Sequence, residues 1–131
     1  MQSTTTFLKY AIAGLIVSVI GVAIVWLLAN AISPDLYAKP PGQDMARLTF
    51  GTAIFVTLVD GTVGALIGWL LFWRNKPRSW WYVIVAIVLV LEAINAFHGT
   101  TTTETALWLN VMHLAAGLPL AYAIGQTLRR G

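Results

Sequence analysis

Four long apolar segments, separated by short polar stretches, fill most of this chain of 131 residues. A helix needs roughly 20 mostly apolar residues to cross the hydrocarbon core of a bilayer. The four segments cover about residues 10–32, 48–73, 80–98 and 104–128. A helix satisfies its own backbone hydrogen bonds in lipid, whereas an open strand does not. The sequence therefore predicts one all-α domain, residues 1–131, that forms an integral membrane four-helix bundle.

The composition agrees with a membrane location. Only 10% of the residues are charged and 58% are hydrophobic, whereas soluble domains carry about 25% charged residues. The absence of cysteine excludes disulfides, iron–sulfur clusters and cysteine-based zinc sites. The net charge of +3 comes from basic residues beside the apolar segments, so we interpret it as a topology signal and expect no nucleic-acid partner. We expect a multi-pass protein of the cell membrane, in contact with membrane lipid.

Basic residues in the connections predict the orientation. The connection between the second and third segments carries Arg74, Lys76 and Arg78, the C-terminal end carries Arg129 and Arg130, and the third connection carries no lysine or arginine. Positive connections stay in the cytoplasm, which predicts that the N and C termini are both cytoplasmic. The second and third connections are short, so we expect the last three helices to be antiparallel neighbours.

The first segment has a second interpretation. Lys9, a long apolar stretch and the sequence Ala29-Asn30-Ala31 resemble a signal peptide with its cleavage site. The apolar stretch is longer than such a peptide requires, so we interpret it as a retained helix.

Small residues predict where the helices pack, because close approach drives helix association in lipid. They recur on one face of three segments: Gly14, Ser18 and Gly21 in the first, Gly61, Gly64 and Gly68 in the second, and Ala106, Gly117 and Ala121 in the fourth. We favour packing within the bundle. The alternative is a homodimer through Gly64 and Gly68.

Three ionisable residues lie within the apolar segments, namely Asp60, Glu92 and His113. Each costs roughly 2.5–3.5 kcal/mol in a bilayer on insertion scales, and such residues usually serve a function. Their helical phase places them, together with Asn95 and Asn110, on the inward-facing sides of their helices. Their distance from the helix ends places them in the outer half of the bundle. We therefore predict one polar cluster there, while structural pairing across helices is the alternative.

The predicted cluster suits acid–base chemistry on a lipophilic substrate of the isomerase or cyclase type. We assign the catalytic roles to Asp60, Glu92 and His113, with Asp60 or Glu92 as the acid and His113 as the base or orienting group. The substrate-binding candidates are Asn95, Asn110, Thr57 and Trp108. No metal-ligand spacing or cofactor motif is present, so we expect neither a metal nor a cofactor. The alternatives are a proton-coupled transporter that works as a dimer and a non-catalytic subunit of a larger membrane complex.

The segment Leu107–Ala116, which contains Met112-His113, resembles the last helix of an uncharacterised family of small actinobacterial four-helix membrane proteins. The chain length, the four segments and the basic second connection are similar as well. The resemblance implies a bacterial inner-membrane protein and draws attention to His113. It implies no activity, and Asp60 and Glu92 do not follow from it.

Overall fold

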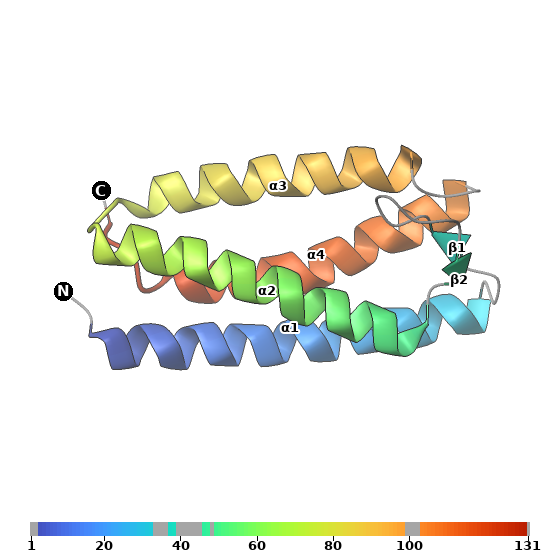
Figure 1. Ribbon diagram of the computed structural model, residues 1–131, viewed down its shortest axis with the longest axis horizontal. Helices are drawn as coiled ribbons and strands as arrows, with labels where there is room; N and C mark the ends of the chain where they lie inside the picture. The colour runs from blue at the N-terminus through green and yellow to red at the C-terminus, as the bar shows by residue number, and fades with distance from the viewer. Residues whose placement is uncertain (1–2, 33–36, 39–45, 48, 99–102, 131) are drawn as a thin grey trace.

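The described part of the chain forms four helices and a short two-stranded ribbon (Figure 1). The computed structural model describes residues 3–32, 37–38, 46–47, 49–98 and 103–130. The helices are α1 (Thr4–Ile32), α2 (Phe50–Trp73), α3 (Arg78–His98) and α4 (Thr103–Gly125), and the strands are β1 (Tyr37–Ala38) and β2 (Ala46–Arg47). All four helices are long and apolar enough to cross a membrane. The predicted all-α class with four such helices is confirmed.

The helix ends differ from the predicted segments for local reasons. Helix α1 begins at Thr4 instead of near residue 10 because Ser3 caps it, accepting a hydrogen bond from the backbone N–H of Thr6 at 3.2 Å. Helix α4 ends at Gly125 instead of near residue 128, and the chain continues in turns. The antiparallel pairing of Tyr37 with Arg47 was not predicted, since a two-residue strand carries no periodic signal.

Four helix ends meet at one end of the bundle, which we call the basic end. Here α1 begins, α2 ends, α3 begins and α4 ends (Figure 1). The ring of Phe7 lies 5.3 Å from the rings of Trp69 and Phe72, which ties α1 to α2. The backbone N–H of Arg78 donates to the carbonyl of Arg129 at 2.8 Å, which ties α3 to the segment after α4. The clustering of these ends agrees with the charge pattern, and the cytoplasmic orientation stays a prediction.

Helix α4 is the central element, since it packs against the other three helices and most extensively against α1. Glycine makes that approach close: a Cβ at Gly14 would lie 2.8 Å from Cβ of Ala123 and 3.0 Å from Cα of Leu120. At Gly21 it would lie 3.4 Å from the carbonyl oxygen of Ala115. The small-residue face of α1 is therefore the face that α4 covers.

Gly61 and Gly68 of α2 lie against other helices of the same chain. Gly68 is buried, and a Cβ there would lie 2.7 Å from Cγ2 of Ile124. A Cβ at Gly61 would meet the side chain of Leu15 in α1. Gly64 is half-buried, with Leu120 Cδ2 3.8 Å from the Cβ position. The homodimer through Gly64 and Gly68 stays a prediction, and packing inside the bundle already accounts for Gly68.

Ser18 gives the first testable prediction. Its side chain is 0% exposed, and its Oγ has no hydrogen-bond partner among the described residues. A buried hydroxyl without a partner costs about 1–3 kcal/mol by protein mutational data. We therefore expect Ser18→Ala to keep the free energy of unfolding or to raise it by up to about 1 kcal/mol. Titration of the detergent-solubilised protein with dodecyl sulfate, followed by circular dichroism, measures this, and a clear loss of stability would contradict it.

Candidate functional site

A groove with a volume of about 300 Å³ lies between α2 and α3. These two helices run antiparallel but make few direct contacts, contrary to the expectation from their short connection. They are close at the basic end and separate toward the opposite end (Figure 1). Helices α2 and α3 form the walls, and α4 forms most of the floor. The groove opens sideways, because Val56, Val63 and Val88 line it and are exposed.

Trp81 fixes the narrow end of the groove. Its side chain is only 3% exposed, and its indole N–H donates to the carbonyl of Ala121 at 2.8 Å, which holds α3 on α4. The same ring lies 3.6 Å from the Cβ position of Gly68 in α2. Beyond Trp81 the lining contains small residues, Gly64 and Gly117 among them, so that space remains between the walls.

The three ionisable residues of the apolar segments line this groove from three different helices. Asp60 lies on α2, Glu92 on α3 and His113 on α4. Asp60 is near enough to His113 and to Glu92 to interact electrostatically with each. Within the described residues, no three side chains of the metal-binding types are close enough to hold a metal ion. The three groups thus line one groove, with spacing too wide for them to share a metal ion.

His113 and Thr57 contribute further polar atoms to the lining. Nδ1 of His113 is buried and has no hydrogen-bond partner within the described ranges, although its side chain as a whole is half-buried. The hydroxyl of Thr57 is buried and donates to the carbonyl of Ala53 at 2.8 Å, so its oxygen can still accept a hydrogen bond. The lining of the groove therefore retains unused hydrogen-bonding capacity on α2 and α4.

Three other candidates lie elsewhere. Asn95 is exposed and does not line the groove, because the lining of α3 ends at Glu92, three residues earlier. Asn110 is half-buried and is not part of the lining either. Trp108 packs with Ala29 and Met112 and does not itself line the groove. Their substrate-binding roles stay predictions, without a place in the groove to support them.

Several lining residues were not predicted. Neither Trp81 nor the valines that form the entrance had a predicted role in the site. In sequence the exposed valines resemble any lipid-facing residue. Their place at a groove depends on the divergence of α2 from α3.

The fold and the groove define a class of protein. It is a small four-helix protein with titratable side chains in a lateral groove. Its helices are long and apolar enough to cross a membrane, which suggests a multi-pass membrane protein. The chain belongs to DUF6069, a family of unknown function, which it matches over residues 2–130. Neither the comparison with curated proteins nor that with solved structures gave a match. The resemblance to an uncharacterised family is thereby confirmed, while the actinobacterial host and the Met-His pair as a family feature stay predictions.

Proposed function

We propose that the lateral groove binds a lipophilic molecule with one polar group, and that Asp60, Glu92 and His113 contact that group. One observation carries the proposal: three titratable side chains from three helices line a single, mostly apolar groove. Ionisable residues inside a bilayer are costly and usually mark a functional path or site. Pairing for stability alone would bring the groups together, whereas here they border an open space.

The shape of the groove indicates the kind of ligand. Ligand sites are mostly apolar with a few polar groups that set orientation, and they measure roughly 300–1,000 Å³. A volume of about 300 Å³ therefore suits one branched or folded hydrocarbon segment and its polar end better than a whole phospholipid. The exposed valines on both walls allow entry from the acyl chains without passage through water.

The same groups give the proposal a catalytic form. A carboxylic acid in an apolar surrounding can protonate an alkene or epoxide, and a nearby imidazole can remove a proton from a neighbouring carbon. Asp60 or Glu92 would act as the acid and His113 as the base in an isomerase- or cyclase-type reaction. Binding does not depend on this step, so the experiment below tests binding alone.

The binding experiment uses a long-chain alcohol that carries a photoreactive alkyl diazirine, added to the full chain in lipid nanodiscs. We expect adducts on the groove-facing peptides of α2 and α3. Asp60→Asn, Glu92→Gln and His113→Ala should each lower their yield roughly five- to tenfold, since the amides lose the stronger hydrogen bond of a carboxyl group and alanine loses that of the imidazole, at a cost of about 1–1.4 kcal/mol.

Two matched substitutions serve as controls. Glu104→Gln and His98→Ala change the same residue types at exposed positions that do not line the groove, and they should leave the yield unchanged. Undiminished adduct formation in all three groove variants would reject the proposal. A groove filled by water would favour the transporter, and a closed, dry interface between α2 and α3 would favour the structural subunit.

A further inference from the structure

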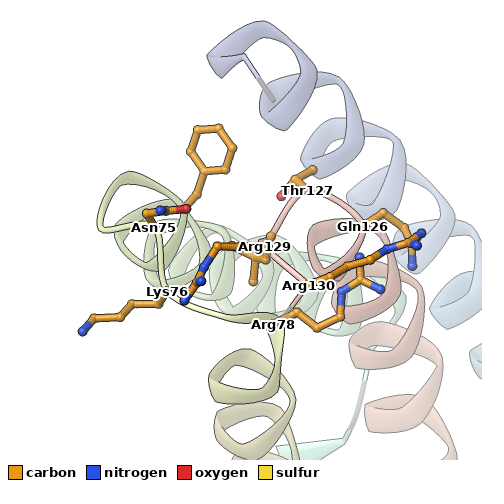
Figure 2. Close-up of a pocket in the computed structure, with 9 residues that line it drawn as sticks. Asn75, Lys76, Arg78, Gln126, Thr127, Arg129 and Arg130 are labelled. Carbon is orange, nitrogen blue, oxygen red and sulfur yellow. The ribbon is translucent and has the colours of Figure 1, made fainter. Parts of the chain in front are cut away.

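A second hollow, with a volume of about 470 Å³, lies at the basic end of the bundle. We call it the basic end pocket. Its polar lining comes from the α2–α3 turn and from the segment after α4, as Figure 2 shows. These side chains are Asn75, Lys76, Arg78, Gln126, Thr127, Arg129 and Arg130. The pocket is separate from the lateral groove, and no residue lines both.

The backbone holds the two halves of the basic end pocket together. Asn75 has a φ of 50°, a left-handed conformation that asparagine tolerates, and it turns the chain sharply after α2. Pro77 and Arg129 form a parallel bridge, and the N–H of Arg78 donates to the carbonyl of Arg129 at 2.8 Å. Arg129 is thus fixed beside the start of α3 by backbone contacts that do not depend on its side chain.

The pocket is lined by four cationic side chains and, within the described residues, by no carboxylate. Lys76 extends away from the other labelled side chains (Figure 2), and its ammonium lies 4.8 Å from the ring centre of Trp80. Three guanidinium groups remain, and Nε of Arg78 is buried without a hydrogen-bond partner among the described residues. A buried donor without an acceptor is unfavourable, and like charges without a counter-ion repel each other. An anion in the pocket would relieve both.

We propose that the basic end pocket binds a phosphate group. Guanidinium groups pair with phosphate through two parallel hydrogen bonds, and several arginines around one hollow are suited to its tetrahedral oxygens. Trp73 and Trp80, which flank the turn and are exposed, are of the type that lies in the headgroup layer of a bilayer. The phosphate group of an anionic phospholipid is therefore the source that we expect, and a soluble phosphate is the other source of the same chemistry.

The test compares two double substitutions that remove the same charge. R129Q/R130Q acts in the pocket, whereas K9Q/R74Q acts at the same end outside it: Lys9 is exposed on α1, and Arg74 lies 6.0 Å from the ring centre of Trp73. Native mass spectrometry of the full chain in neutral detergent, with equal amounts of phosphatidylglycerol and phosphatidylcholine, measures lipid binding. We expect preferential binding of phosphatidylglycerol, weakened about tenfold by R129Q/R130Q and less than twofold by K9Q/R74Q.

A second arm titrates inorganic phosphate into the same samples without lipid. Phosphate binding that R129Q/R130Q abolishes would support the pocket with a soluble source. Equal losses in both double variants, or no binding of either probe to the unchanged chain, would overturn the proposal. R78K serves as a milder variant, in case the double substitution impairs folding. It keeps the positive charge but lacks the planar guanidinium that makes two parallel hydrogen bonds. It should weaken binding measurably with an unchanged helical circular dichroism signal, and full affinity in R78K would contradict a role for the guanidinium.

Discussion

Replacing Gly14 by leucine is expected to lower the free energy of unfolding by about 3 kcal/mol, the largest stability effect that we predict for a single substitution. The reason is the close contact of α1 with α4. A Cβ at this position would already lie 3.0 Å from Cα of Leu120. That neighbour is backbone and cannot rotate away, so α1 must move off the helix that it contacts most.

Gly51 provides the matched control for this substitution. It lies in the first turn of α2, with nothing within 4 Å of its Cβ position. Gly51→Leu should leave stability unchanged or raise it by up to about 1 kcal/mol, since leucine is the better helix former. Unfolding of both variants in mixed detergent micelles, followed by circular dichroism, gives the comparison. Equal stability of Gly14→Leu and the unchanged chain would show that α1 and α4 are further apart than described.

Filling the lateral groove should have the largest effect on ligand binding. Gly64 lines the groove from α2, and the nearest neighbour of its Cβ position is the flexible side chain of Leu120, 3.8 Å away. A phenyl ring at this position would occupy the space proposed for the ligand without forcing helices apart. We expect Gly64→Phe to reduce photoadduct formation in the groove at least a hundredfold, about 2.7 kcal/mol, and to change stability by less than about 1 kcal/mol.

The control for Gly64→Phe is Gly51→Phe, which adds the same ring to the same helix outside the groove. It should leave the adduct yield unchanged. If Gly64→Phe binds the probe as the unchanged chain does, the probe is not in the groove. If it loses both binding and fold, the smaller Gly64→Val should still bind less probe at full stability.

The glycines show how far the fold could be predicted from sequence. The spacing of Gly14, Ser18 and Gly21 predicted a contact face on the first helix, and that face packs on α4. The identity of the partner did not follow, since every helix carries small residues. The separation of α2 from α3 was also not predicted. A short connection limits the distance between two helix ends, but it does not make the two helices pack along their length.

The candidate site could also be predicted only in part. Phase and depth placed Asp60, Glu92 and His113 toward one interior region, and they line one groove; their catalytic roles stay predictions. Asn95 was included because it lies close to Glu92 in phase, but α3 buries only Trp81 and Ala96, a narrow face.

The charge pattern of the sequence did not predict the basic end pocket. Sequence alone assigned Arg78, Arg129 and Arg130 to the same side of the membrane. Their meeting in one pocket depends on the long-range backbone contact of Pro77 and Arg78 with Arg129, for which neither segment carries a local signal.

The central claim is that a lateral groove holds a lipophilic molecule against titratable side chains. Nuclear Overhauser spectroscopy of the methyl-labelled chain in nanodiscs tests this claim most directly. The methyl groups of Val56, Val63 and Val88, which line the entrance, report what fills the groove. We predict cross-peaks from these methyls to hydrocarbon chain protons, lost in Gly64→Phe at the methyls nearest the new ring. Cross-peaks to water alone, or a closed contact of α2 on α3 that excludes hydrocarbon, would contradict the account.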